Sequence, residues 1–183
     1  MKSFGHFANL LEFSGDIICG DLNSSSDVDK LSEYKFDLIF HQAAISDTRV
    51  EDQAIIMRTN VNTFYRIIEI AKKDNAKLIY ASSAATYGNL AAPQSEGLEA
   101  PDSPYAYSKY VMDKIASNHC AKHPDARIVG LRYFNVYGPG EFFKRKTASM
   151  VLQLGHQIVD GLQPRLFEGS MEFKRDFVYI SDV

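Results

Sequence analysis

One stretch near the middle of the chain constrains its fold more than any other. Residues 78–83 form a short apolar run that ends in two serines, which is typical of a buried strand that opens into a loop. Ser103 and Pro104 then predict the start of a helix, with Ser103 as its N-cap and Pro104 at its first position. Tyr105 and Lys109 are four residues apart, so both side chains lie on one face of this helix. The stretch therefore predicts a strand-end serine close to a helical Tyr/Lys pair.

Strand and helix patterns alternate along the rest of the chain, after a loosely helical spacing in residues 1–12. The expected strands are residues 16–22, 36–40, 77–82, 127–132, 165–167 and 176–180, and the expected helices are residues 24–31, 61–73, 104–122 and 147–160. Strands separated by helices are typical of a parallel sheet that is covered on both faces. We therefore expect an α/β fold with a doubly wound, Rossmann-like parallel sheet.

The composition is that of a globular protein and narrows the classes of partner. The 183 residues carry a net charge of −3, so there is no electrostatic reason to expect a nucleic acid or an anionic membrane as partner. Cys19 and Cys120 are too few for a disulfide framework or a zinc site, so we expect a reducing, cytoplasmic setting and no metal. We expect no signal peptide and no membrane span, because no stretch has the required length and hydrophobicity.

Short clusters that contain polar or small residues fall at the carboxyl ends of four of the expected strands. They are Asp21 and Leu22, residues 42–46, Ser82 and Ser83, and Asn135 and Val136. The carboxyl ends of parallel strands meet at one edge of a sheet, where ligands bind in doubly wound folds. We therefore expect a binding site at this edge.

A tyrosine and a lysine one helical turn apart can carry out acid–base chemistry. An ammonium group favours the phenolate, so Lys109 is expected to lower the pKa of Tyr105 from its usual value of about 10. A serine hydroxyl can then hold the oxygen that the tyrosine deprotonates. Tyr110 and Lys114 repeat the spacing, but they lie well round the helix and beyond its first turn, so the Tyr105 pair is preferred. The pair alone is a weak signal.

Three blocks together resemble the extended short-chain dehydrogenase/reductase family, which includes the NAD-dependent epimerases and dehydratases. They are the serines with Tyr87 and Gly88 after the strand, the Tyr105/Lys109 pair, and residues 132–139, in the order and spacing of the family. The resemblance extends over nearly the whole chain. Within the family, residues 80–88 and 167–179 are most similar to the branch that epimerises carbon 6 of an ADP-heptose.

This resemblance implies an enzyme that binds a nicotinamide cofactor. The implied reaction is epimerisation at carbon 6 of ADP-glycero-manno-heptose, by transient oxidation with tightly bound NADP, to supply the lipopolysaccharide core. The two implied acid–base groups are Tyr105 and Lys144, with Ser83 orienting the oxygen and Lys109 also holding the nicotinamide ribose. NAD is the alternative cofactor, because the strand that selects between the two does not occur in the sequence. The implied partner is a nucleotide sugar, and the complete enzyme is expected to be a homo-oligomer.

The resemblance also implies which residues bind the two ligands. The implied cofactor-binding residues are Asp21, Leu22, Gln42, Ala43, Ala44, Ile45, Ser46, Asn60, Lys109, Val136 and Lys144. The implied substrate-binding residues are Ser83, Asn135, Lys146, Phe167, Glu168, Gly169, Ser170 and Arg175. Arg175 is expected to donate to the diphosphate. Lys146 and Gln153 depart from the serine and histidine of the relatives, which puts the sugar contacts on that side in question.

The glycine-rich turn of the family, whose helix receives the pyrophosphate, does not occur in the 183 residues. The implied domains are a partial Rossmann domain, residues 1–135, and the start of an interleaved substrate-binding region, residues 136–183. Without the first two strands of the family, strand 16–22 has lost its neighbours and an apolar edge is exposed. We expect the 183-residue chain alone to be poorly stable and inactive, and to bind NADP weakly or not at all.

Other functions on the same fold remain as alternatives. A UDP-sugar 4-epimerase shares the Ser/Tyr/Lys set but does not need Lys144 as a second base. A 4,6-dehydratase needs an acidic pair directly after the strand-end serine, where this chain has Ala84 and Ala85, so dehydration is disfavoured. A catalytically incomplete remnant, or an interaction module built on this fold, is the alternative outside the enzymes.

Overall fold

The computed structural model describes residues 7–183, which form two compact units. Residues 18–133 make up the first, called the sheet unit below. Residues 134–183 and the described residues up to 17 make up the second, called the tail unit. The functional division at residues 135 and 136, which the resemblance implies, stays a prediction.

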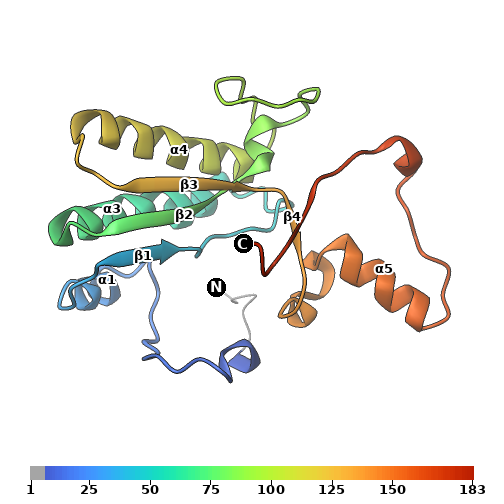
Figure 1. Ribbon diagram of the computed structural model, residues 1–183, viewed down its shortest axis with the longest axis horizontal. Coiled ribbons are helices and arrows are strands. Elements are labelled where there is room, and N and C mark those ends of the chain that lie inside the picture. The colour runs from blue at the N-terminus through green and yellow to red at the C-terminus, as the bar shows by residue number, and fades with distance from the viewer. Residues whose placement is uncertain (1–6) are drawn as a thin grey trace. The chain divides into compact units, whose positions relative to one another are not determined.

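A three-stranded parallel sheet is the centre of the sheet unit (Figure 1). Its strands, in spatial order, are β1 (Leu38–His41), β2 (Lys77–Ser83) and β3 (Ile128–Tyr133). β2 pairs in parallel with both neighbours, and Leu78 lies opposite Ile128 in the register. A parallel pair needs a crossover connection, and here a helix lies in each one. The predicted α/β fold with a parallel sheet is confirmed.

Helices begin where the sequence supplies N-caps. The helical elements of the sheet unit are α1 (Ser25–Leu31), α2 (Gln53–Ile56), the π-helix η2 (Met57–Asn62), α3 (Thr63–Asp74), the 3₁₀ turn η3 (Ala84–Tyr87) and α4 (Pro104–Lys122). Ser24 and Ser103 cap α1 and α4 as predicted. The helix predicted over residues 61–73 belongs to a longer run that begins at Gln53, because the Asp52 side chain accepts the N–H of Ile55 and caps it there.

The core of the sheet unit lies where α3 and α4 pack against β2. Leu78 and Tyr80 alternate along β2, so both point to the same face of the sheet and meet Phe64 of α3 and Met112 of α4 there. These four side chains are at most 3 % exposed. Each buried side chain of this size contributes about 1.5–3 kcal/mol relative to an exposed one.

The opposite face of the sheet carries exposed apolar side chains. Phe40 is 63 % exposed, Val129 52 % and Leu38 42 %. These residues alternate with the buried ones, so they lie on the face away from α3 and α4. The sequence predicted helices on both faces of the sheet. In the part of the chain that the structure describes, α3 and α4 cover one face.

The tail unit contains a pair of short parallel strands and one α-helix. Its elements are η1 (Phe7–Leu10), β4 (Asn135–Tyr137), η4 (Phe142–Thr147), α5 (Met150–Val159), η5 (Ser170–Glu172) and β5 (Phe177–Tyr179). Glu141 links the turn after β4 to the start of α5. Its carboxylate accepts the N–H of Gly138 at 3.1 Å, and the N–H and hydroxyl of Ser149 at 2.6 and 2.7 Å.

Two predicted strands are wrong. Residues 16–22 and 165–167 have irregular backbone, and both Ile17 and Phe167 are more than half exposed. The apolar content of both runs suits a strand, but a strand also needs a neighbour to take up its ladder hydrogen bonds. Neither run pairs with a strand of the two sheets that residues 7–183 form.

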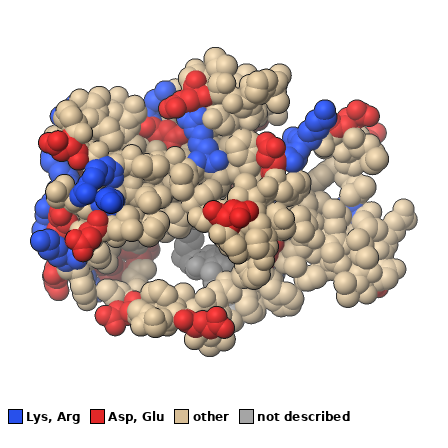
Figure 2. All heavy atoms as spheres, viewed as in Figure 1, with Lys and Arg blue, Asp and Glu red and all other residues tan. Residues whose placement is uncertain are grey.

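Acidic and basic side chains are interspersed on the face of the molecule that Figure 2 shows. No large patch of one sign stands out there, in keeping with a net charge of −3. Among residues 7–183, no helix combines the length and the hydrophobicity needed to cross a membrane.

Candidate active site

Ser83 lies at the carboxyl end of β2, where the chain turns into η3. Its Oγ accepts the N–H of Ala85 at 3.1 Å and so caps the 3₁₀ turn, and its carbonyl accepts the hydroxyl of Thr86 at 2.9 Å. Ser83 therefore satisfies local backbone groups at the end of the strand. A capping Oγ still has a hydroxyl proton and a lone pair for another partner.

The side chain of Tyr105, in the first turn of α4, lies close to that of Ser83. Burial raises the pKa of the Tyr105 phenol, and its hydrogen bond with the Ser83 side chain partly offsets that rise. The tyrosine is 8 % exposed and Ser83 9 %. The strand-end serine and the helical tyrosine therefore meet, as the sequence predicts.

Lys109 lies one turn further along α4 and is 3 % exposed. Its Nζ donates to the carbonyl oxygen of Ala81 at 2.7 Å and lies 5.9 Å from the centroid of the Tyr105 ring. Burial lowers the pKa of Lys109 to about 8. The predicted lowering of the Tyr105 pKa is not what the structure shows, because burial dominates and the ammonium group is bonded to the Ala81 carbonyl.

The second pair with the same spacing points elsewhere. Lys114 is exposed and its Nζ lies 5.0 Å from the centroid of the half-buried Tyr110 ring. Neither side chain of this pair shares the buried position of Tyr105 and Lys109. The structure thus separates two pairs that are identical in sequence spacing.

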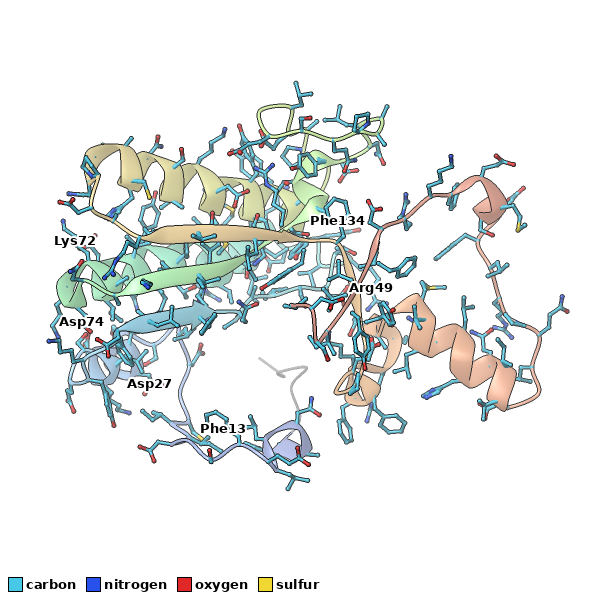
Figure 3. The ribbon with its side chains drawn as sticks, in the orientation of Figure 1. Phe13, Asp27, Arg49, Lys72, Asp74 and Phe134 are labelled. Atoms are coloured by element: carbon cyan, nitrogen blue, oxygen red, sulfur yellow. The ribbon has the colours of Figure 1, made fainter. Side chains whose placement is uncertain are left out.

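The loop after β1 supplies small, accessible residues to the carboxyl edge of the sheet. Gln42, Ala43 and Ser46 are exposed and Ala44 is half-buried, whereas Ile45 is buried. In Figure 3, Arg49 lies beyond this edge, while Lys72 and Asp74 lie at the opposite end of the sheet. Small side chains in this loop allow a ligand to approach the backbone closely.

Asp21 and Leu22 differ in what they offer a ligand. The Asp21 carboxylate is exposed and accepts the backbone and side-chain N–H groups of Asn23, both at 2.9 Å, which lowers its pKa. Leu22 is half-buried against the core of the sheet unit. Only the Asp21 side chain is therefore fully accessible.

Asn60 is fully buried in η2, and its amide group is engaged within the protein. Its Oδ1 accepts the N–H of Ile45 at 2.8 Å, and its Nδ2 donates to the Ile45 carbonyl at 3.1 Å and to Ser108 Oγ at 3.0 Å. The predicted contact of Asn60 with a cofactor stays untested, but this side chain has no N–H left to offer.

Two further candidate site residues line one cavity of the tail unit. Val136 of β4 and Lys144 of η4 both line an open cavity of about 620 Å³, together with Asn9, Glu12 and the turn at residues 137–141. Lys144 itself is exposed. Its role as a second base stays a prediction.

The remaining predicted substrate residues of the tail unit are mostly exposed, and Ser170 is half-buried. They are Asn135, Lys146, Phe167, Glu168, Gly169, Ser170 and Arg175. Asn135 donates to the carbonyl of Asp176 at 2.8 Å, and the Arg175 guanidinium lies 5.8 Å from the centroid of the Phe173 ring. Their contacts with a substrate stay predictions.

Sequence reasoning missed a charged network behind the site. Arg132 of β3 donates to Glu99 at 2.6 Å and to Asp113 of α4 at 3.0 Å, and its guanidinium lies 4.8 Å from the Tyr87 ring. Burial would raise the pKa of Glu99, but hydrogen bonds from Gly97 and Arg132 outweigh it and lower the pKa to about 2. The signal that could have revealed it is a charged residue, Arg132, among the apolar residues of a strand.

A comparison with protein-family models decides the classification. The model of the NAD dependent epimerase/dehydratase family matches residues 3–183. The chain belongs to this family. Among curated members of the family, the ADP-L-glycero-D-manno-heptose-6-epimerase of Brachyspira hyodysenteriae is 38 % identical over 178 residues, which are 96 % of this chain and 56 % of that protein.

Solved structures of family members share the fold. The ADP-L-glycero-D-manno-heptose-6-epimerase of Helicobacter pylori matches with a TM-score of 0.92 and 49 % identity, over 98 % of this chain and 57 % of that one. A UDP-N-acetylglucosamine 4-epimerase from Methanobrevibacter ruminantium matches with a TM-score of 0.84 and 29 % identity, over 97 % of this chain and 59 % of that one. The chain thus spans a little over half the length of these epimerases.

The edge described above fits one part of the cofactor that the family name implies. The buried Lys109 ammonium group lies 5.9 Å from the centroid of the Tyr105 ring, and the exposed residues Gln42, Ala43 and Ser46 follow the carboxyl end of β1. An ammonium group and hydroxyl groups are hydrogen-bonding groups that suit the ribose at the nicotinamide end. Among residues 7–183 no cluster of three or more metal-ligating side chains occurs.

Proposed function

We propose that the protein acts as an ADP-glycero-manno-heptose 6-epimerase that uses NADP. One observation supports this above all: the side chains of Ser83 and Tyr105 are both buried and interact with each other at the carboxyl edge of the sheet, with the buried Lys109 one helical turn further along α4. The similarity to two heptose epimerases, at 38 and 49 % identity, supports the choice of substrate. Because those proteins are nearly twice as long as this chain, the activity is proposed for the whole protein.

In the proposed reaction, Ser83 and Tyr105 act on the hydroxyl group at carbon 6. Ser83 donates a hydrogen bond to the reacting oxygen, and the Tyr105 phenolate removes its proton. The bound cofactor supplies hydride acceptance and return. As the hydride leaves, the C–O bond becomes a carbonyl, and the return of hydride to the other face with a proton from the enzyme restores the hydroxyl with inverted configuration.

Inversion requires an acid–base group on each side of carbon 6. Lys144 is proposed as the second group, so that Tyr105 serves one configuration and Lys144 the other. Lys109 is proposed to hold the nicotinamide ribose and to favour the Tyr105 phenolate once a cofactor replaces its present partner, the Ala81 carbonyl. Arg175 is proposed to donate to the diphosphate of the sugar nucleotide.

The direct test is an assay of the whole protein, of which residues 1–183 are a part, with ADP-glycero-manno-heptose and NMR detection of the epimeric product. Tyr105→Phe and Lys144→Met are each expected to lower the rate of epimerisation by a factor of about 10²–10⁴. Loss of activity in Tyr105→Phe with full activity in Lys144→Met would contradict the two-base assignment. No turnover by the wild-type protein with NADP would contradict the proposed substrate.

A second candidate is a UDP-sugar 4-epimerase, which the fold match with the Methanobrevibacter ruminantium enzyme favours. Such an enzyme acts on a ring carbon and has no need of Lys144. Turnover of UDP-N-acetylglucosamine that survives Lys144→Met would support it over the heptose reaction.

Cofactor choice and assembly belong to the same proposal. We propose NADP over NAD, a homo-oligomeric state and a cytoplasmic location, with products used for the lipopolysaccharide core. Residues 1–183 alone are proposed to bind NADP weakly, because the glycine-rich turn for the pyrophosphate does not occur among them. A fluorescence titration of this polypeptide with NADPH tests the point, and tight binding would contradict it.

A further inference from the structure

The segment that carries Lys144 is closed at its base by one carboxylate. Glu141 Oε1 accepts the N–H of Gly138 at 3.1 Å and the hydroxyl of Ser149 at 2.7 Å, and Glu141 Oε2 accepts the N–H of Ser149 at 2.6 Å. Gly138 lies directly before residues 139–148 and Ser149 directly after them, so the Glu141 side chain holds the two ends of this segment together. Residues 139–148 are called the lysine loop below.

The Glu141 side chain is buried and favours its ionised form. It is 9 % exposed. Burial would raise the pKa of Glu141, but hydrogen bonds from Ser149 and Gly138 outweigh burial and lower this pKa, and the charge of Lys144 adds to the lowering. Hydrogen bonds to a charged group are stronger than those between neutral groups. The base of the lysine loop is therefore firmly closed.

Within the loop, both backbone polar groups of Lys144 are also held. Its N–H donates to the carbonyl of Glu141 at 2.9 Å, and its carbonyl accepts the hydroxyl of Thr147 at 2.8 Å. The Lys144 side chain lines the cavity that Val136 also lines. The position of Lys144 beside this cavity thus depends on Glu141 on one side and on the end of the loop on the other.

The residue after Lys144 has a strained backbone. Arg145 has a φ of 52° and a ψ of −119°, although residues with a side chain rarely adopt a positive φ. Such strain persists only where the surrounding structure fixes it, and it is concentrated at functional sites. Because a loop with free ends could relax, the closure at Glu141 explains how this conformation is maintained next to Lys144.

We propose that Glu141 is a positioning residue for Lys144, because it closes the lysine loop and so fixes the backbone that carries the proposed second base. Glu141 exchanges no proton with the substrate and acts only through the loop. The catalytic part of this inference rests on the proposed function, whereas the closure of the loop does not. The simpler alternative is that Glu141 only stabilises the start of α5, where a negative charge is favourable.

Hydrogen exchange tests the closure without any enzymatic activity. Glu141→Gln keeps the length of the side chain but leaves one acceptor oxygen, because its NH₂ group cannot accept a hydrogen bond. One backbone N–H then loses its acceptor, so we expect the amide of Gly138 or of Ser149 to exchange about tenfold faster than in the wild-type protein. The matched control is Glu172→Gln, which changes an exposed glutamate of the same unit and should leave both rates unchanged.

The amide of Ile180 reports on the rest of the tail unit, because it donates to the Tyr137 carbonyl at 2.9 Å. It should keep its wild-type exchange rate in Glu141→Gln. The proposal is overturned if the amides of Gly138 and Ser149 both exchange at their wild-type rates in this variant. It is also overturned if these two amides and that of Ile180 accelerate equally, because that result reports global destabilisation.

A double-mutant cycle tests the catalytic part in the whole protein. Alone, Glu141→Gln should lower kcat about tenfold and leave the KM for the sugar nucleotide within twofold. Added to Lys144→Met, it should change the remaining rate by less than twofold, because no second base is left to position. A further tenfold loss in the Lys144→Met protein would show that Glu141 acts by another route, and would overturn the positioning role.

The two experiments separate this inference from the proposed function. A wild-type protein without epimerase activity would contradict the proposed function. The exchange rates of the Gly138 and Ser149 amides would still decide whether Glu141 closes the lysine loop.

Discussion

At the scale of single residues, burial acts against both charged forms that the chemistry needs. It raises the pKa of Tyr105 and lowers that of Lys109 to about 8. A phenolate and an ammonium group are each unfavourable in a buried position. With the Lys109 ammonium group bonded to the Ala81 carbonyl, the site therefore favours the protonated, neutral form of Tyr105.

The first prediction concerns the phenol. Tyr105→Phe should lower kcat by a factor of about 10²–10⁴, because it removes a proton-transfer group and leaves the ring packing. Tyr110→Phe is the matched control, since Tyr110 lies on the same helix outside the site, and it should keep at least half of the activity. Equal loss in the two variants, measured by epimerisation under identical conditions, would refute the assignment.

The second prediction concerns the lysine. Its pKa in the folded state, about 8, lies below the usual 10.5, so the unfolded chain binds more protons between these values. The free energy of unfolding should therefore rise with pH from about 8 to 10.5. Below pH 8, Lys109→Met should be more stable than the wild-type protein, on the order of 2 kcal/mol.

Denaturant unfolding at pH 7 and at pH 10.5 measures this effect. The stability difference between Lys109→Met and the wild-type protein should shrink at the higher pH. The variant should also lose epimerisation, so one residue trades stability for function. A variant that is less stable at pH 7 would mean that the hydrogen bond to Ala81 outweighs the burial of the charge.

At this scale the sequence predicted positions better than energies. Ser83 and Tyr105 meet as expected, because a strand end and a capped helix start are local patterns. The direction of the Tyr105 pKa was wrong, because burial depends on residues from several elements. Ser108 went unnoticed, since a serine beside a lysine shows its partners only when the chain is folded.

At the scale of elements, Arg132 joins a strand, a helix and a loop. Its guanidinium pairs with Asp113 of α4 and with Glu99 of the loop before it, while Tyr80 donates to the same Asp113 at 2.9 Å. Gly130 leaves room for the Tyr80 ring, because a Cβ there would lie 2.4 Å from it. The network thus fixes the edge strand β3 against α4.

The third prediction tests how much the Arg132 network stabilises the fold. Arg132→Gln should cost about 3 kcal/mol of stability, because it leaves two carboxylates largely buried without their partner. Arg49→Gln is the control, since the Arg49 side chain is 60 % exposed in its ion pair with Asp47 and should contribute less than about 1 kcal/mol. Denaturant melts of both variants give the comparison, and similar losses would contradict the argument.

Whether an element was predicted correctly depended on whether local residues or a distant segment stabilise it. The start of α4 was predicted to the residue, because Ser103 and Pro104 mark it in the sequence itself. Residues 16–22 have the composition of a strand but no strand partner among the described residues. Local signals suffice for a capped helix, whereas a strand exists only through its neighbour.

At the scale of the whole molecule, the two faces of the sheet differ in what they contribute. Leu78 is fully buried beneath α3 and α4, whereas Val129 is 52 % exposed on the other face. In a polypeptide of residues 1–183, Leu78→Ala should cost about 2–5 kcal/mol. Val129→Thr should change stability by less than about 0.5 kcal/mol. A larger loss in Val129→Thr would show that this face is covered in solution.

The strand order has a consequence for the route of folding. β1, β2 and β3 are parallel neighbours. The chain between two paired strands therefore contains at least one complete helix, and the ribosome must synthesise it before the partner strand is available. No pair of these strands forms a hairpin that could nucleate early and locally. Contacts between distant parts of a chain form slowly, so the sheet should be a late and rate-limiting event, while α4 can form within microseconds. During synthesis, β1 and β2 are thus exposed to other chains before β3 has left the ribosome, and that interval is when aggregation competes with folding.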